Sequence, residues 1–234
     1  MIRKSFSVLC LLVSLAILST AQTVLTNLDS KTGWKSCSQC AGAGGTGTLA
    51  THWFKQGVTS PALDGASMQF FLGGTNNYSN AYWWKPVAYG TTATNFVYDF
   101  YYYIKDSNAP QALEFEVNQG LNSKKYIFGT QCGFASRVWR VYDAYNHRWV
   151  ATTIACSSTA AYKWHHVVLE FHRTSTGKSQ FVTISINGQK FYLNREYSPK
   201  ATSIRSLNVA FQMDGNKYQT DFSTWLDKVN LKYW

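Results

Sequence analysis

The chain has 234 residues and a formal net charge of +10, with 16% aromatic and only 15% charged side chains. Its Lys and Arg residues are scattered, with no run longer than a pair such as Lys124-Lys125. Without a clustered basic footprint, nucleic acid is excluded as the expected partner. The positive balance still admits an anionic polysaccharide, and the surplus of Trp and Tyr indicates that some aromatic rings lie outside the core.

The first residues predict a secretory signal peptide over residues 1–21. A short basic segment, Met1-Ile-Arg-Lys4, precedes an apolar run from Phe6 to Leu18 and the small residues Ser19-Thr-Ala21. The apolar run is too short for a membrane span, and no later run is long enough. Cleavage would leave a net charge of about +8, which assumes the loss of Arg3 and Lys4. We therefore expect a secreted protein, extracellular or periplasmic, that is monomeric and has no membrane span.

Residues 22–234 are predicted to form one all-β domain. Short runs rich in Val, Ile, Tyr, Phe and Trp alternate with turns of Gly, Asn, Ser and Thr, the pattern of a sandwich or barrel. The predicted strands are 23–28, 67–72, 80–84, 95–104, 112–119, 125–132, 138–142, 149–156, 164–173, 180–193, 207–213 and 227–233. About a dozen strands without a linker or repeat predict two packed antiparallel sheets.

The stretch at residues 111–119 carries an unusual pair of acids. Side chains on a strand alternate between two faces. The apolar face here has Leu113, Phe115 and Val117, and the polar face has Glu114, Glu116 and Asn118. Two of the four Glu residues in the chain thus share one face. Because like charges repel, the pair predicts a bound cation, a bound proton or a polyhydroxylated ligand, unless basic residues on neighbouring strands neutralise it.

Other strands offer side chains that could share this face. Gln212 and Asp214 alternate with apolar residues, although Asp214-Gly215 could simply begin a turn. Trp84 could provide an aromatic surface for the apolar face of a sugar, unless its ring is covered. Arg140 and Tyr142 have the same parity on one strand, where they could bind a ligand or neutralise Glu114.

Four cysteines survive cleavage, and in an exported protein an even number predicts disulfides. Cys132 and Cys156 are symmetric about residue 144, within the predicted hairpin turn Asp143-Ala-Tyr-Asn146. We expect the bonds Cys132–Cys156 and Cys37–Cys40.

Two segments resemble a known superfamily. Trp164-His-His-Val-Val-Leu-Glu-Phe-His172 and Phe181-Val-Thr-Ile-Ser-Ile-Asn-Gly188 resemble paired strands of laminin-G-like and concanavalin A-like lectin/glucanase domains. Asn187-Gly188 independently suits a type I′ hairpin. The resemblance implies a jelly-roll sandwich with a concave sheet that binds glycans.

The stretch Glu114-Phe-Glu-Val-Asn-Gln119 is similar to the E-x-D-x-x-E strand of retaining β-glucanases in this superfamily. Matched by position, Glu114 stands at the nucleophile, Glu116 replaces the assisting Asp, and Gln119 stands at the acid/base. Because Gln cannot protonate a leaving group, this departure argues against hydrolysis. The stretch also resembles the V-E-F-D strand of legume lectins, whose acids hold metal ions, so a structural Ca²⁺ is an open expectation while no cofactor is required.

These observations predict a secreted, lectin-like domain that binds a polysaccharide through Trp84, Glu114, Glu116, Asn118, Arg140, Tyr142, Gln212 and Asp214. One alternative is a glycoside hydrolase that uses Glu114 with Glu116 or Asp214. Another is a lyase or binder of an anionic polysaccharide, and a last one is a structural adhesion domain with paired acids. Serine hydrolase and zinc protease motifs are absent from the sequence. His165 and His166 face opposite ways on a strand, which spoils them as paired metal ligands.

Overall fold

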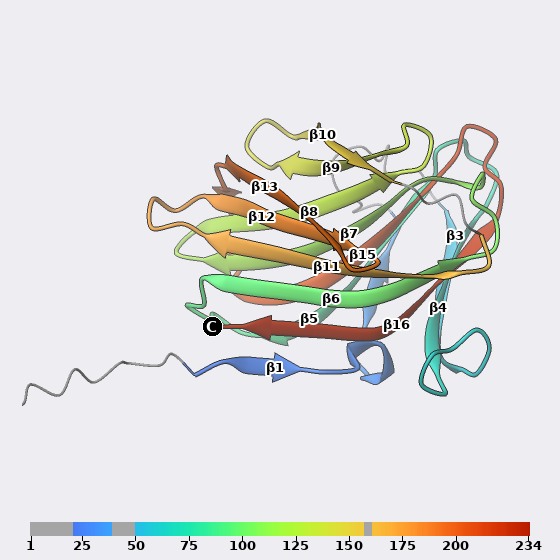
Figure 1. Cartoon of the computed structure of the whole chain (residues 1–234), viewed down its shortest axis with the longest axis horizontal. Helices are drawn as coiled ribbons and strands as arrows, with labels where there is room; N and C mark the ends of the chain where they lie inside the picture. Colours follow the sequence, from blue (N-terminus) through green and yellow to red (C-terminus); the bar gives the residue numbers. More distant parts are fainter. Residues whose placement is uncertain (1–20, 39–49, 157–160) are drawn as a thin grey trace, which may run out of the picture.

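The computed structural model describes residues 21–38, 50–156 and 161–234, which form two antiparallel sheets packed face to face (Figure 1). The back sheet has the order β13-β12-β11-β6-β16-β4-β3, with β1 beside β16. Its strands are β1 (Thr23–Leu25), β3 (Thr51–Val58), β4 (Ser67–Gly73), β6 (Asn95–Ile104), β11 (Trp164–Arg173), β12 (Ser179–Ile186), β13 (Gln189–Tyr197) and β16 (Phe222–Tyr233). The predicted all-β class and two-sheet antiparallel sandwich are confirmed.

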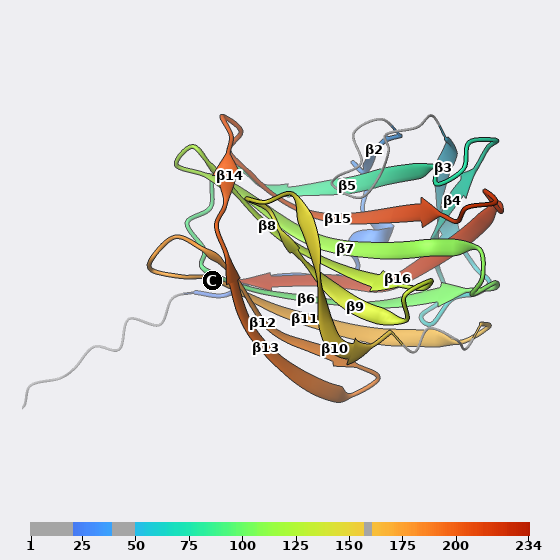
Figure 2. The ribbon, with the colours of Figure 1, turned by 90° about the horizontal axis from the view of Figure 1, so that it is seen from above.

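The front sheet has the order β10-β9-β8-β7-β15-β5-β2, with β14 paired to β8. Its strands are β2 (Lys35–Cys37), β5 (Asn80–Ala88), β7 (Pro110–Leu121), β8 (Lys124–Gly133), β9 (Val138–Asp143), β10 (Arg148–Ala155), β14 (Lys200–Ala201) and β15 (Ser206–Gly215). Seen from above, β7, β15 and β5 run side by side, whereas β10 is strongly twisted relative to them (Figure 2). The acid-bearing stretch lies in β7, in the middle of this sheet.

The core lies between the sheets, as the period-two pattern of residues 111–119 predicts. Leu113, Phe115 and Val117 of β7 are fully buried. Phe115 stacks on Phe100 of the back sheet with ring centroids 4.4 Å apart, and on Phe211 of β15 at 5.3 Å. Alternation therefore leaves the even-numbered residues of β7 on the outer face of the front sheet.

The two segments that carry the family resemblance pair as expected. Strand β11 has the predicted bounds and pairs antiparallel with β12. Asn187 and Gly188 both have positive φ, 50° and 86°, as a type I′ turn requires between β12 and β13.

Most predicted strands differ from the observed ones by a few residues at their ends, the predicted strand 180–193 is divided into β12 and β13, and three strands were not predicted. The first strand stops at Leu25, and a 3₁₀ helix, η1 (Leu28–Ser30), follows it. The missed strands β2, β3 and β14 are short or lie at sheet edges. Strand β3 carries His52, Lys55 and Gly57 and is half exposed along its length, so its composition has little of the apolar signal on which the prediction depended.

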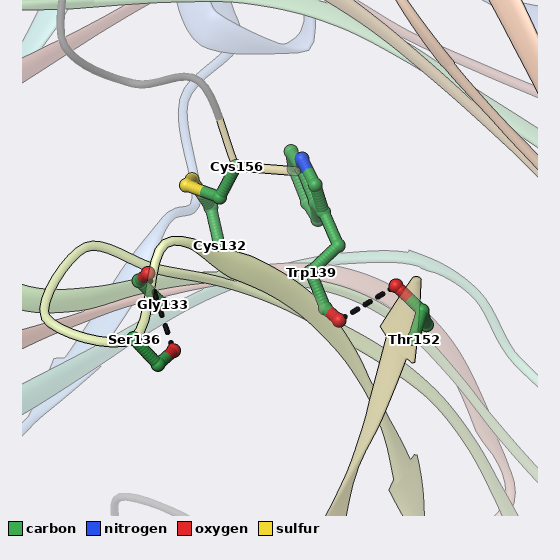
Figure 3. Close-up of a disulfide and its surroundings, with 6 residues drawn as sticks. All are labelled: Cys132, Gly133, Ser136, Trp139, Thr152 and Cys156. Atoms are coloured by element: carbon green, nitrogen blue, oxygen red, sulfur yellow. Dashed lines mark hydrogen bonds between the residues drawn. A yellow bond between two sulfur atoms is a disulfide. The ribbon is translucent and has the colours of Figure 1, made fainter. Parts of the chain in front are cut away.

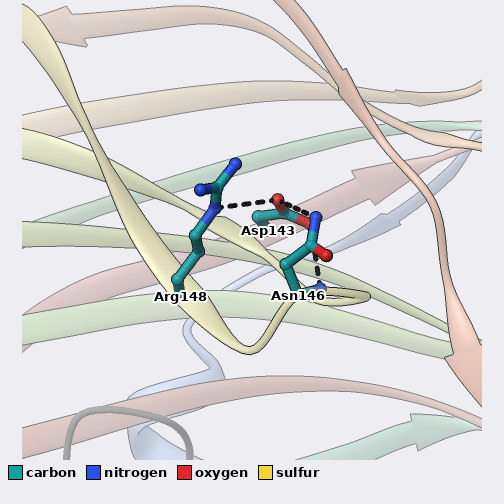
Figure 4. A network of polar contacts seen from close by, with 3 residues as sticks. All are labelled: Asp143, Asn146 and Arg148. Carbon is teal, nitrogen blue, oxygen red and sulfur yellow. Dashed lines mark hydrogen bonds and ion pairs between the residues drawn. The ribbon is translucent and has the colours of Figure 1, made fainter.

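The predicted disulfide Cys132–Cys156 is confirmed, with Cα atoms 5.4 Å apart (Figure 3). It joins the end of β8 to the residue that follows β10. Nearby, Thr152 Oγ1 of β10 donates to the Trp139 carbonyl of β9 at 2.8 Å. The hairpin turn between β9 and β10 is also confirmed: the Asp143 carboxylate accepts from Asn146 Nδ2 at 2.8 Å and Arg148 Nε at 3.3 Å (Figure 4).

Two sequence predictions fall outside the described residues. Cys40 lies in the segment 39–49, so the bond Cys37–Cys40 stays a prediction, as does the signal peptide, since residues 1–20 are not described. Within residues 21–38, 50–156 and 161–234, no helix has the length and hydropathy to cross a membrane.

Candidate functional site

The outer face of the front sheet brings the predicted site residues together in rows that cross the strands. One row pairs Arg140 with Gln131, Gln131 with Glu114, Glu114 with Gln212, and Gln212 with Tyr82. In the next row, Glu116 is opposite Gly129 on one side and Ala210 on the other, and Ala210 is opposite Trp84. Antiparallel register thus places side chains from β9, β8, β7, β15 and β5 around the two acids.

The missing side chain at Gly129 lets aromatic rings close over one flank of Glu116. A Cβ placed on Gly129 would lie 3.2 Å from Tyr142 Cβ, 3.3 Å from Glu116 Oε1 and 3.4 Å from a ring carbon of Trp149. The rings of Tyr142 and Trp149 pack with centroids 5.1 Å apart. Burial beside Glu116 and Glu114 raises the pKa of Tyr142 to about 12, so the phenol stays neutral. Tyr142 therefore helps to cover the acids.

Glu116 is held by two neutral donors. Its Oε2 accepts from Asn118 Nδ2 at 2.8 Å and from the Tyr82 hydroxyl at 3.2 Å. Asn118 Nδ2 also lies 3.1 Å from the Tyr82 oxygen, so the three side chains form one cluster. Burial, followed by the charge and hydrogen bond of Glu116, holds the pKa of Tyr82 well above its ordinary value. Hydrogen bonding to neutral groups thus satisfies this carboxylate.

Glu114 is fully buried, at 0% exposure, and its position beside Asp214 favours a proton shared between the two carboxyls. Burial, together with the charges of Asp214 and Glu116, raises the pKa of Glu114 well above its ordinary value. The Glu114 carboxyl hydrogen-bonds to that of Asp214, whose own pKa burial raises to about 6. Amide donors complete the pair: Gln131 Nε2 donates to Glu114 Oε1, and Gln212 Nε2 donates to Asp214 Oδ1, both at 2.8 Å. Two adjacent buried carboxyls repel each other less when one of them is protonated, and both pKa values are shifted in that direction.

Arg140 does not neutralise Glu114 directly. Its Nη1 donates instead to Gln131 Oε1 at 3.3 Å, and Gln131 then donates to Glu114. In the part of the chain that the structure describes, no Lys or Arg forms an ion pair with Glu114, Glu116 or Asp214. The alternative that basic neighbours merely pair with the acids is therefore wrong for the described residues.

The position of Gln119 corrects the motif-based mapping. Gln119 has the opposite parity to Glu114 and Glu116, and β7 pairs with β15 and β8 without a register shift at this point. Its side chain is buried on the other side of the strand, where Nε2 donates to the carbonyls of Thr91 and Ala93, each at 2.9 Å. Gln119 thus does not occupy an acid/base position beside the two acids, and Asn118 is the next residue of β7 on their face.

A cavity of about 440 Å³ opens beside this cluster at the Asn118 end of the face. It is lined by Tyr82, Trp84, Pro86, Asn118, Gly120, Lys125, Thr202, Ile204, Ser206 and Asn208. Tyr82 and Trp84 form a stacked pair in it, with ring centroids 5.7 Å apart and planes inclined by 29°. Strand β14 pairs with the start of β8, and the segment after it crosses so close to Gly120 that a Cβ there would overlap the Ile204 carbonyl. This crossing forms one wall of the cavity.

A smaller cavity of about 110 Å³ lies at the opposite end of the face, and Asp214, Arg140, Gln131 and Trp149 are among its lining residues. The predicted residues therefore divide by position. Trp84 and Asn118 line the larger cavity, and Arg140 and Asp214 line the smaller one. The remaining four are buried between them: Glu114, Glu116, Gln212 and Tyr142.

Sequence reasoning predicted only Trp84 and Asn118 of the ten residues that line the larger cavity. The hydroxyl and amide groups of Thr202, Ser206 and Asn208, and the ammonium group of Lys125, come from segments brought together by the pairing of β7 with β15 and β8 and of β14 with β8. Alternation in β15 could have placed Asn208 with Gln212, since both have even numbers. For the Ca²⁺ expectation, no group of three or more His, Cys, Asp or Glu side chains suited to a metal ion occurs within the described ranges.

Comparisons with known proteins reveal likeness in structure but not in sequence. No family model matches the chain, and no curated protein matches it. A protein of unknown function with a galectin-like fold from Bacillus subtilis superposes with a TM-score of 0.52 at 8% identity, over 88% of this chain and 94% of the other. "Cellulose induced protein, Cip1" gives 0.51 at 11% identity, over 88% and 96%. Arcelin-5, a lectin-like defence protein from Phaseolus vulgaris, gives 0.51 at 10% identity, over 92% and 99%. At such low identity these likenesses establish a lectin-like sandwich fold and leave the ligand open.

Proposed function

We propose that the chain is an exported carbohydrate-binding protein of the concanavalin A-like superfamily that holds a polysaccharide in the cavity beside Trp84. One observation carries the proposal: a stacked aromatic pair, Tyr82 and Trp84, shares one open cavity with amide and hydroxyl side chains. A sugar ring has an apolar CH face and a rim of hydroxyls. An aromatic surface flanked by polar groups complements both.

Asn118 supplies a specific reason for a hydroxyl-bearing ligand. Its Oδ1 is buried and has no hydrogen-bond partner among the residues that the structure describes, although the side chain lines the cavity. A buried acceptor without a donor costs about 1–3 kcal/mol. A sugar hydroxyl that enters the cavity can donate to this oxygen, while Glu116 and Tyr82 hold the amide in place. The lectin-like fold shared with arcelin-5 is compatible with this role.

Hydrolysis is a second candidate because of one observation at the smaller cavity. Asp214 lines that cavity and has a pKa raised to about 6 by burial, as a general acid working near neutral pH requires. Glu114, by contrast, is fully buried and keeps its proton, so it does not suit the nucleophile role. A hydrolase would therefore have to use Glu116 and Asp214 as its pair of catalytic carboxyl groups.

The test is binding to a panel of polysaccharides, read for both retention and release of reducing ends. Trp84→Ala should weaken retention about tenfold or more, because it removes half of the aromatic surface. Trp53→Ala is the matched control: Trp53 is 41% exposed on the back sheet and stacks on Phe71. Equal retention of the Trp84 and Trp53 variants would contradict the proposed site. Reducing ends that appear with wild type but not with Asp214→Asn would favour the hydrolase.

A further inference from the structure

The larger cavity contains a cation without an acidic partner. Lys125, at the start of β8, is half-buried and lines the cavity together with Trp84 and Asn118. Two lysines at the surface do have acidic partners: Lys190 lies 2.8 Å from Glu170, and Lys178 lies 3.6 Å from Glu196. Lys125 differs from the remaining unpaired lysines of the described residues because it lines the larger cavity. Across residues 21–38, 50–156 and 161–234, no carboxylate lies within ion-pair distance of Lys125.

The surroundings of Lys125 favour an added negative charge. Burial lowers the pKa of its ammonium group, the charge of Glu116 raises it, and that of Lys200, opposite on β14, lowers it. Glu116 meanwhile accepts hydrogen bonds from Tyr82 and Asn118. An anion in the cavity would give this partly desolvated cation the partner that the protein does not provide.

The acids of the front sheet do not oppose such an anion as strongly as their number suggests. Burial and neighbouring charges raise the pKa of Glu114 well above its ordinary value, which favours its neutral form and reduces the negative charge of this face. Asp214 lines the smaller cavity, at the other end of the face from Lys125. The net charge of +10 adds a favourable field for a polyanion.

We infer that the cavity selects polysaccharides whose repeating units carry an anionic group, a carboxylate or a sulfate. The Lys125 ammonium pairs with that group, while the Tyr82 and Trp84 rings contact the sugar. This inference rests on the proposed carbohydrate-binding function and specifies its ligand class.

Two pairs of polymers isolate the charge, because each pair shares a backbone. Polygalacturonate is compared with its methyl ester, and dextran sulfate with dextran, by calorimetry at low and high salt. We expect wild type to bind one or both anionic members at least about tenfold more tightly than the neutral member. The pair that shows the larger difference tells carboxylate from sulfate. Because exposed charges are screened, the preference should shrink but not vanish in high salt.

Lys125→Met is compared with Lys163→Met, which removes the same charge from an exposed turn before β11 of the back sheet. The Lys125 variant should lose about tenfold in affinity for the anionic member and little for the neutral one, and the Lys163 variant should change less than about twofold. Equal losses in both variants, or equal binding of charged and neutral polymers, would overturn the inference. If neutral polymers bind in a manner that depends on Trp84, the proposed function stands and only the charge selection fails. If no polymer binds, both fail.

Discussion

Replacing Asp214 with Asn tests the shared proton through the pH dependence of stability. Burial raises the pKa of Asp214 from 3.8 to about 6 in the folded protein. Between these values the folded state holds a proton that the unfolded state releases, so the contribution of Asp214 to stability is fully present below about pH 4 and is lost as the pH rises through 6. A shift of about two pH units corresponds to about 3 kcal/mol of unfolding free energy.

Urea unfolding followed by Trp fluorescence, from pH 4 to pH 8, measures this slope. The wild-type free energy of unfolding should fall towards pH 8, and in Asp214→Asn the fall should be smaller by about 3 kcal/mol. Glu114 acts in the same direction, because its pKa is also raised, so part of the slope remains.

Asp29 provides the matched control. It is buried near β16 of the back sheet, and burial raises its pKa to about 6 as well. Asp29→Asn should remove a similar share of the slope, and the two effects should add, because Asp29 lies in η1 against the back sheet whereas Asp214 lies in the front sheet. Parallel stability curves for wild type and Asp214→Asn would refute the shared-proton account.

Three further predictions test parts of the fold. Replacing both Cys132 and Cys156 with Ala should cost about 3 kcal/mol, because the bond closes a loop with a sequence separation of 24; thermal unfolding measures this loss, with reduced wild type as the control. Gly129→Ala should cost about 1–3 kcal/mol and shift Trp fluorescence, because its methyl group would crowd the Glu116 carboxylate and Tyr142, against which Trp149 packs. Gln119→Glu should cost about 2 kcal/mol or more and create no hydrolytic activity, because it buries a carboxylate against two backbone carbonyls.

Each of these has an outcome that would contradict it. An unchanged melting temperature after reduction would show that the disulfide does not constrain the edge of the front sheet. A stable Gly129→Ala variant with unaltered fluorescence would mean that the aromatic cover is not tightly packed. Hydrolysis by Gln119→Glu would return that residue to the face of the acids.

Local patterns predicted the fold well because burial in a two-sheet sandwich repeats every second residue. The alternation in residues 111–119 placed Phe115 inward and Glu114 outward, and the Asn187-Gly188 signal located a hairpin. Strand β3 was not predicted because an edge strand with polar residues lacks a clear alternation of apolar and polar side chains. Patterns of period two therefore reveal strands that are buried on one face, whether or not their neighbours are known.

The site was only partly predictable because its geometry depends on which strands are neighbours. The sequence assigned Glu114 and Gln212 to outward faces, but only the pairing of β7 with β15 makes them opposite. Gln131 was not a candidate, yet it separates Arg140 from Glu114 and replaces the expected ion pair by a relay of hydrogen bonds. Lys125 and Ser206 meet in one cavity because both are opposite Gly120 of β7, a neighbour relation that no local pattern encodes.

The sequence offered three ways to stabilise like charges on β7: a cation, a proton or a hydroxylated ligand. Burial and the neighbouring acids favour the protonated form of Glu114, and the donors Tyr82 and Asn118 bind Glu116, so the fold holds both acids without a bound cation. Because the Asn118 Nδ2 group donates to Glu116, the side-chain oxygen Oδ1 of Asn118 is the atom that can accept a hydrogen bond in the cavity. The role of Glu116 is therefore to orient Asn118. The residues that would contact the proposed ligand directly are Asn118, Trp84 and Lys125. Glu116→Gln should then weaken binding by misplacing Asn118, but it should not reduce the preference for anionic over neutral polymers, because it removes a negative charge that acts on Lys125.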